Sequence, residues 1–164
     1  MATENTQFMP STLNLSSKVY ADLRLKLIIG DLKPGQTLSI RTLAEAYDHG
    51  SMPVREALRQ LSSEGALVGE AKKAYRVPDL SANEAAKLFY VRAALEGASA
   101  EIAAKTVEPK DIKHLRQLST KMDGAWEVNN AGSFLENNFL FHSYIYAMAK
   151  NSVLEKMAEN LYIR

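Results

Sequence analysis

Apolar residues recur at helical spacing in the first part of the chain. Val19, Leu23 and Leu27 follow one another at four-residue intervals, which places them on one face of a helix. Gly30 comes directly after this pattern, at a position where a glycine commonly ends a helix. The residues therefore predict a first helix that begins at Ser16 and ends near Gly30.

Two further helices are predicted on either side of a short polar break at residues 48–51. Ser39 has the position of an N-cap for a short helix, because its hydroxyl group can accept a hydrogen bond from the first turn. Pro53 lies in the first turn of the next helix, where a missing N–H group costs nothing. Apolar residues then follow at helical spacing until Gly65, and these are Val54, Ala57, Leu58 and Leu61.

Residues 66–77 favour a hairpin of two short strands. We expect the strands at residues 66–69 and 74–77, joined by a tip that contains Lys72 and Lys73. Two helices with a tight glycine-containing turn between them form a helix-turn-helix, and a hairpin after them forms its wing. This arrangement is typical of proteins that bind DNA.

The second half of the chain contains only helical patterns. After a connector at residues 78–80, Ser81 and Glu84 form a Ser-x-x-Glu capping box that opens a long helix. Three more helices are expected, beginning near residues 109, 133 and 152. No stop signal follows Leu161, and four helices are few to cover one another, so we expect an incomplete all-α bundle. The fold class is mainly α: a winged helix-turn-helix followed by a helical bundle.

Three segments are expected: a mobile N-terminal arm (1–15), a DNA-binding domain (16–78) and a helical effector and dimerisation domain (79–164). Residues 16–78 carry ten basic and seven acidic side chains, whereas residues 79–164 carry ten and eleven. This difference permits DNA contact without establishing it. The absence of cysteine excludes disulfides and thiolate metal sites. No apolar run is long enough for a membrane span, so a cytoplasmic protein is expected.

Two stretches of the chain resemble a family of bacterial regulators. Residues 32–60 resemble the GntR family, and residues 91–96 (VRAALE) resemble the start of the FCD ligand-binding domain of its FadR-like branch. Phe141-His142 and the later Ala149-Lys150-Asn151 fit the same domain. The matching positions of the first stretch are Pro34, Gly35, Leu38, Arg41, Leu43, Ala44, Glu45 and the run from Pro53 to Leu58.

The resemblance implies a homodimeric transcription regulator, expected to be a repressor. In this family a small-molecule effector in the helical domain changes binding to double-stranded operator DNA, and many of these effectors are organic acids. The FCD domain usually also holds a divalent metal, such as zinc or nickel, with one aspartate and three histidines.

The DNA-contacting residues are expected on the second and third helices and on the wing. Arg55 and Arg59 lie four residues apart on the polar face of the third helix, where a guanidinium can donate two hydrogen bonds to guanine or phosphate. Arg41 and Arg55 also match DNA-contact positions of the family. The alternative is an exposed arginine paired with Asp48 or Glu56. The expected set is Ser39, Arg41, Ser51, Met52, Arg55, Arg59, Lys72 and Lys73.

Three positions depart from the family pattern. Ser51 stands where relatives have a base-reading arginine, and Gly50 where they have a capping serine, so Ser51 is a candidate to take over the cap. The operator preference is therefore expected to differ. Lys72 and Lys73 are candidate phosphate contacts, with a solvated lysine pair as the alternative. Ala74 replaces the family's wing glycine.

The candidate effector-binding residues are Arg92, Asn138 and His142. Asn138 and His142 lie four residues apart on one helix face, where two ligand-type side chains can grip one metal ion. The resemblance places them on the family's metal aspartate and histidine, but a neutral amide is a weaker ligand, so metal is expected only in a longer form. His142 has a hydrogen-bonded core role as its alternative. Arg92 suits a carboxylate, and its alternative is a salt bridge to Glu96 or Glu101.

The residues give no support to an enzyme. The chain has no phosphate-cradling glycine loop, no His-Glu-x-x-His motif and no nucleophile elbow around a serine. The alternative function from another class is a winged-helix module for protein interaction or dimerisation, without ligand sensing.

Overall fold

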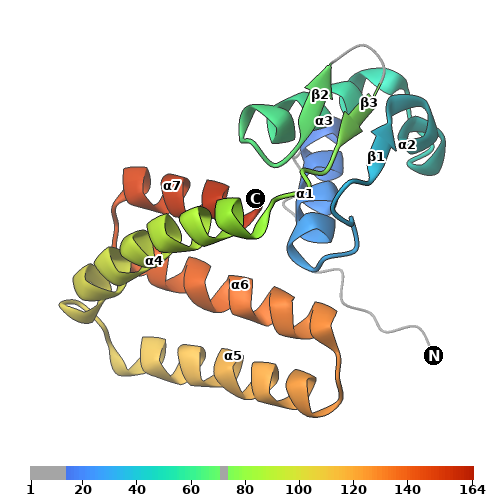
Figure 1. Ribbon diagram of the computed structural model, residues 1–164. Coiled ribbons are helices and arrows are strands. Elements are labelled where there is room, and N and C mark those ends of the chain that lie inside the picture. The colour runs from blue at the N-terminus through green and yellow to red at the C-terminus, as the bar shows by residue number, and fades with distance from the viewer. Residues whose placement is uncertain (1–13, 71–73) are drawn as a thin grey trace.

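The computed structural model describes residues 14–70 and 74–164, and its fold is mainly α with one small sheet (Figure 1). The N-terminal unit and the helical unit lie side by side, joined by the connector before the fourth helix. The predicted fold class, a winged helix-turn-helix followed by helices, is confirmed. The elements are α1 (Leu15–Ile28), β1 (Thr37–Ser39), α2 (Ile40–Ala46), α3 (Ser51–Ser63), β2 (Val68–Glu70), β3 (Ala74–Arg76), α4 (Ala82–Ala104), α5 (Pro109–Glu127), α6 (Ala131–Met148) and α7 (Ser152–Tyr162).

The core of the N-terminal unit forms where α1 packs on α3. Both helices bury one apolar face, because their apolar residues recur every three or four positions. The sheet closes one side of this core through Leu38 and Tyr75. The largest fully buried side chains of the two helices are Val19, Leu23, Val54, Leu58 and Leu61.

The sheet has three strands in the order β1-β3-β2, with both pairs antiparallel. The predicted hairpin is present as β2 and β3, but β2 begins at Val68 rather than at residue 66. Residues 66 and 67 are instead buried after the turn at Gly65, which has a φ of +77°. β1 was not predicted, because three residues carry no periodicity and its partner β3 lies far along the chain. The expected wing-tip residues Lys72 and Lys73, and most of the expected arm, lie outside the described residues.

Side-chain caps fix where several helices begin. The Ser39 side chain accepts a hydrogen bond from the Thr42 backbone N–H, as predicted. Ser81 and Glu84 form the predicted capping box at the start of α4. The proposed capping role of Ser51 is wrong, because Gly50 is the N-cap residue of α3 and makes no side-chain bond, while Ser51 is already the first helical residue.

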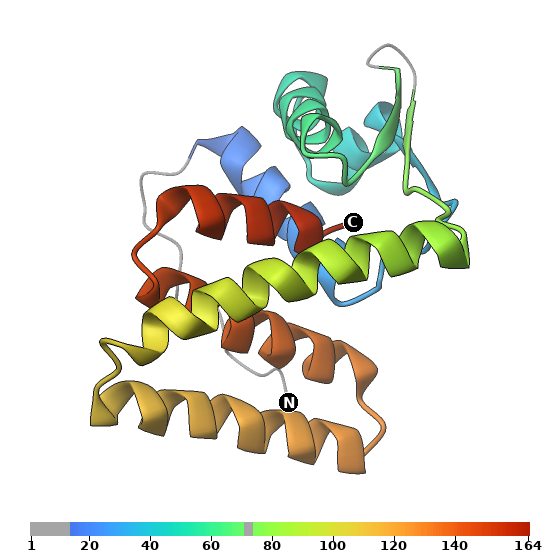
Figure 2. The same cartoon turned by 60° about the vertical axis from the view of Figure 1, so that its left-hand side comes forward.

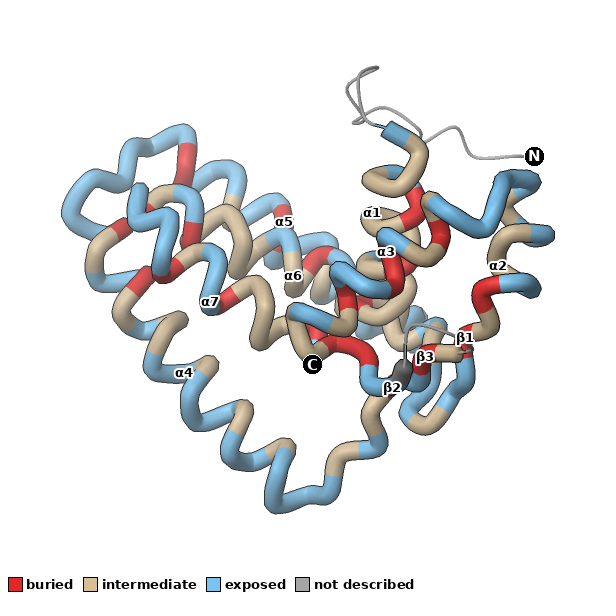
Figure 3. Tube along the Cα trace, turned by 90° about the horizontal axis from the view of Figure 1, so that it is seen from above, coloured by how far each residue is buried: buried red, intermediate tan, exposed pale blue. Residues whose placement is uncertain are grey.

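The helical unit stacks α7, α4, α6 and α5 in layers, with α5 on the side away from the N-terminal unit (Figure 2). α5 and α6 make the most extensive helix pair, and α4 packs on both α6 and α7. Among the described residues after position 81 there is no strand, as predicted. Figure 3 shows that the first half of α4 is mostly exposed, whereas buried positions gather towards its end, at Ser99 and Ala103.

The end of α7 joins the two units. Ile163 is 5% exposed and belongs to the core cluster of the N-terminal unit, and Tyr162 and Phe139 pack against that cluster. The Arg24 guanidinium lies 3.2 Å from a carboxylate oxygen of Glu159 and 5.0 Å from the centre of the Phe139 ring. The helical unit therefore completes the core of the N-terminal unit.

Candidate functional sites

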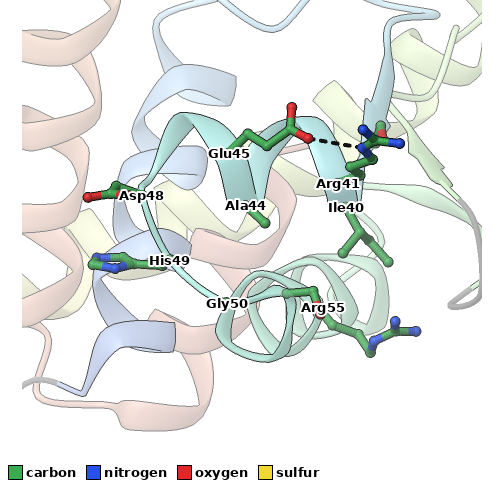
Figure 4. A pocket seen from close by; sticks show the side chains of 10 residues that line it. Ile40, Arg41, Ala44, Glu45, Asp48, His49, Gly50 and Arg55 are labelled. Carbon is green, nitrogen blue, oxygen red and sulfur yellow. Dashed lines mark hydrogen bonds and ion pairs between the residues drawn. The ribbon is translucent and has the colours of Figure 1, made fainter.

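A groove between α2 and the start of α3 brings together several residues that the sequence singled out (Figure 4). Ser39 and Arg41 reach it from the start of α2, and Ser51 and Arg55 from the start of α3. The turn between the two helices supplies Asp48, whose φ of +52° closes the chain tightly. Four of the eight predicted DNA-contacting residues therefore line one hollow.

Arg41 is held in place by an acidic neighbour on its own helix. Its Nε lies 2.9 Å from a carboxylate oxygen of Glu45, four residues later, and its side chain is 89% exposed. From the sequence, Asp48 or Glu56 was the alternative partner of an exposed arginine. In the structure Arg41 pairs with Glu45 instead. Since an exposed pair of this kind holds its partners only weakly, Arg41 is able to leave Glu45 for a stronger anion.

α3 presents a second row of predicted residues on the side opposite its buried face. Met52, Arg55 and Arg59 follow one another at three- and four-residue spacing, so they lie along one stripe of the helix. Met52 is 65% exposed and Arg59 is also exposed. The opposite face is fixed by the buried core positions, which leaves this stripe as the outer surface of α3.

The turn before α3 adds a residue for which the sequence offered no supporting pattern. His49 lines the groove beside Asp48 and is exposed. A single histidine in a polar turn gives no signal in the sequence. Only the packing of α2 across the start of α3 places it in the hollow.

A second cluster lies inside the helical unit around the carboxylate of Glu96. One oxygen, Oε1, lies 3.2 Å from Nε of Arg92, accepts a hydrogen bond of 3.1 Å from the Tyr146 hydroxyl and lies 3.6 Å from Nδ1 of His142. Of the two alternatives for Arg92, the salt bridge to Glu96 is present. Glu101 instead pairs with Lys105.

Burial sets the protonation of this cluster. Desolvation lowers the pKa of His142, and the nearby Arg92 lowers it further, although Glu96 acts in the opposite direction. Burial and the neighbouring Glu96 carboxylate raise the pKa of the Tyr146 hydroxyl. The cluster therefore contains a histidine shifted towards its neutral form and a tyrosine that keeps its proton.

The donors near His142 do not fit a closed zinc or nickel site. The amide oxygen of Asn138 already accepts a hydrogen bond from the Tyr162 hydroxyl, and Glu96 already pairs with Arg92 and accepts a hydrogen bond from Tyr146. His114 packs against Tyr144, two residues from His142 and so on a different face of α6. Among the described residues, no group of three or more histidine, cysteine or acidic side chains is positioned to hold a metal ion.

Comparison with known families identifies the two units. Residues 15–77 match the bacterial regulatory proteins of the gntR family, and residues 87–164 match the FCD domain. The chain is 32% identical to the HTH-type transcriptional regulator McbR of Escherichia coli (strain K12) over 161 residues, which are 95% of this chain and 73% of that protein. The chain therefore belongs to the GntR family of bacterial regulatory proteins, in the branch that carries an FCD domain.

Solved structures support the same assignment. The structure of McbR/YncC from E. coli superposes with a TM-score of 0.87 and covers 93% of this chain and 72% of that one. A GntR regulator from Rhodococcus sp. RHA1, 20% identical with a TM-score of 0.72 over 90% of this chain and 70% of that one, shares the fold.

Another relative is the gluconate operon transcriptional repressor of Bacillus subtilis, which is 30% identical over 145 residues. This match covers 88% of the present chain and spans 59% of that protein. McbR and the gluconate operon repressor are transcriptional regulators, not enzymes. Among the described residues, no helix combines the length and apolar character needed to cross a membrane.

Proposed function

We propose that this protein is a sequence-specific DNA-binding transcription regulator whose operator binding is controlled by a small molecule in the FCD domain. The observation that carries the proposal is the groove between α2 and α3, where Ser39, Arg41, Ser51 and Arg55 surround one hollow. Membership of the GntR family supports the same function.

The chemistry of the outer surface of α3 suits a DNA groove. A guanidinium can donate two parallel hydrogen bonds to O6 and N7 of guanine, or to one phosphate. Because Met52, Arg55 and Arg59 lie along the exposed stripe of α3, this helix would enter the major groove with Arg55 near the bases. Arg41, at the start of α2, would exchange Glu45 for a backbone phosphate.

Replacing Arg55 tests this proposal directly. We expect Arg55→Ala to weaken binding to a selected operator by about 1–3 kcal/mol and to relax base preference at one position. Fluorescence anisotropy titration measures both quantities. The matched control is Arg116→Ala, an exposed arginine on α5 at the far side of the molecule, which should retain the original affinity. Equal affinity and specificity in a folded Arg55→Ala protein would exclude Arg55 from the readout.

The mode of binding follows from the same proposal. GntR-like regulators that bind as homodimers occupy two half-sites, so the operator should be palindromic and the same titration should give two protomers per operator. We propose a repressor, since one relative is named as the gluconate operon transcriptional repressor. A regulator acts where the operator DNA is, so a cytoplasmic location is part of this proposal.

The proposed effector is an organic acid, with Arg92 as the residue that meets its carboxylate. The Arg92 side chain is 25% exposed, and its Nε lies 3.2 Å from the Glu96 carboxylate that an effector carboxylate would compete with. The other two candidate effector-binding residues are already engaged, Asn138 by the Tyr162 hydroxyl and His142 by Glu96.

The competing function is a winged-helix module that binds proteins. DNA binding releases counterions, so the operator affinity of a DNA reader falls steeply as salt concentration rises. A protein-interaction module would show no salt-dependent binding to duplex DNA. Titrations at two salt concentrations therefore separate the two functions.

A further inference from the structure

A hydrogen bond ties the end of α2 to α1, outside the groove that the predicted DNA-contacting residues line. The Tyr47 hydroxyl donates to Oδ2 of Asp22, and the same oxygen lies 2.8 Å from Nζ of Lys26, one turn later on α1. The Lys26 ammonium also lies 5.6 Å from the centre of the Tyr47 ring. We call these three residues the α1–α2 anchor. None of them lines the groove between α2 and α3.

The last turn of α2 is held by few other contacts. The helix has seven residues, and its buried position is Ile40, the first of them. Its main neighbours in the described part of the chain are α3 and β1, and α1 is not among them. Leu43 and Ala44 pack against the core of the N-terminal unit but are only half-buried. Tyr47, the C-cap residue of α2, therefore supplies the connection between α1 and the end of this helix.

The chemistry of the anchor makes it a firm link although its side chains are only half-buried. A hydrogen bond to an ionised acceptor is stronger than one between neutral groups, and here Lys26 holds the same carboxylate oxygen. Burial and the hydrogen bond to Asp22 raise the pKa of the Tyr47 hydroxyl, so Tyr47 keeps the proton that it donates. Asp22 and Lys26 lie on α1, which packs extensively on α3. The anchor thus fastens the end of α2 to the same helix that holds α3.

The angle of α2 over α3 decides the shape of the groove. α2 lies across the start of α3, with Arg41 at one end and Asp48 beyond the other (Figure 4). A helix of seven residues is about 10 Å long, so a tilt of about 3° around Ile40 moves its far end by about 0.5 Å. Binding groups have to be held within about 0.5 Å of their working positions. A tilt too small to disturb folding is therefore large enough to disturb recognition.

We propose that the α1–α2 anchor holds α2 at the angle needed for operator recognition, and that Tyr47 is a positioning residue that acts on DNA binding through α2. The inference rests on the proposed function, because it concerns the specificity of the same groove. Base contacts need the exact shape of the groove, whereas contacts to phosphates alone carry no sequence information and tolerate a changed shape. The anchor therefore affects binding to the operator more than binding to duplex DNA of unrelated sequence.

Tyr47→Phe tests the anchor, because it removes the hydroxyl and keeps the ring that packs against the core. We expect affinity for a selected operator to fall about three- to tenfold. Affinity for a duplex of unrelated sequence should change less than about twofold, since it depends on phosphate charge. Fluorescence anisotropy titration measures both affinities, and a partly unfolded sample lowers both alike, so their ratio reports on positioning. A ratio equal to that of the original chain would overturn the proposal.

Tyr20→Phe is the matched control. Tyr20 also lies on one side of a hydroxyl–carboxylate hydrogen bond, because it donates from α1 to Oε2 of Glu64 over 2.8 Å. Glu64 is the C-cap residue of α3, at the end of that helix away from the groove. The ratio of the two affinities should therefore be unchanged in Tyr20→Phe. An equal fall in Tyr20→Phe and Tyr47→Phe would show a general effect of destabilisation and overturn the proposal.

A double-mutant cycle shows whether the two partners of the hydrogen bond act as one unit. Asp22→Ala should lower the ratio as Tyr47→Phe does, and the two changes together should lower it no further than either change alone. Losses that multiply in the double variant would mean that Asp22 and Tyr47 act separately, which contradicts an anchor.

Amide hydrogen exchange tests the anchor without DNA. The backbone amides of Tyr47 and His49 donate hydrogen bonds to backbone oxygens of α2. In Asp22→Ala, which leaves both residues unchanged, their exchange should accelerate about threefold or more, whereas exchange at Leu58 in α3 should stay the same. Unchanged exchange at Tyr47 and His49 would overturn the proposal. If the original chain bound no operator, the DNA-binding function would fail, and the exchange rates would still decide whether the anchor holds α2.

Discussion

At the scale of single residues, the carboxylate of Glu96 connects α4 to α6. Arg92, His142 and Tyr146 all approach its Oε1, and the partly buried carboxylate is stabilised by the ion pair with Arg92 and the hydrogen bond from Tyr146. The sequence indicated Arg92 and His142 and gave Glu96 as an alternative partner of Arg92. It gave no sign of Tyr146 or Tyr162, because these residues meet the cluster only through the packing of α4, α6 and α7.

The lowered pKa of His142 predicts how stability depends on pH. Burial lowers this pKa below its ordinary value of 6.5, so the folded chain binds a proton less readily than the unfolded chain. The groups that face His142 are Arg92 and Glu96 of α4, Tyr146 of α6 and Tyr162 of α7. The stability that His142 contributes is therefore complete above about pH 6.5 and is lost as the pH falls.

Urea unfolding between about pH 7.5 and pH 5 measures this dependence. The free energy of unfolding should decrease on acidification, and His142→Gln should reduce the slope over this window. His49→Gln, at the exposed turn before α3, is the control and should retain the original slope. If the slope were the same in His142→Gln and in the original chain, the pKa of His142 would be the same in the folded and the unfolded state, which contradicts the prediction.

At the scale of elements, the sequence predicted what local interactions determine. The helices lie within about two residues of their predicted starts, because capping residues such as Ser39 and Ser81 and the helical period act within one element. β1 and the true start of β2 were missed, since both depend on pairing with β3 across the sheet. The groove between α2 and α3 was not predicted as such, but four of the predicted DNA-contacting residues line it, because a tight turn leaves little freedom in how two helices cross.

The wing hairpin contains a position that only glycine suits. Gly69 in β2 has a φ of +128°, and a Cβ atom there would lie 2.9 Å from the backbone oxygen of Ala74. Gly69→Ala should therefore destabilise the chain by about 1–3 kcal/mol in urea unfolding, since neither the strand nor its partner can move away cheaply.

Gly124 provides the opposite case for the same measurement. It lies within α5, and a Cβ atom there meets nothing within 4 Å. Gly124→Ala should stabilise the chain by about 0.5–1 kcal/mol, because alanine loses less backbone entropy than glycine in a helix. A destabilisation of equal size in both variants would contradict the assignment of strain to Gly69.

At the scale of the whole molecule, the helical unit contributes a side chain to the hydrophobic core of the N-terminal unit. The core of the N-terminal unit is built mainly from α1 and α3, yet Ile163 of the helical unit lies within it and Tyr162 packs on it. Sequence patterns could not show this, because an apolar stripe on a helix does not reveal which other helix it packs against. The consequence is that the helical unit is positioned by the same contacts that stabilise the DNA-binding unit.

This shared core predicts that the two units unfold together. Ile163→Ala removes a side chain that is 5% exposed and should destabilise the chain by about 2–4 kcal/mol. Hydrogen exchange at the amides of Leu23 in α1 and Leu58 in α3 should accelerate along with exchange in α7, although neither amide belongs to the helical unit. The control is Val153→Ala on α7, where the side chain is 68% exposed and the expected change lies within about 0.5 kcal/mol. If Ile163→Ala accelerated exchange in α7 alone, the units would open independently, and a shift of α7 caused by a ligand would not reach α3.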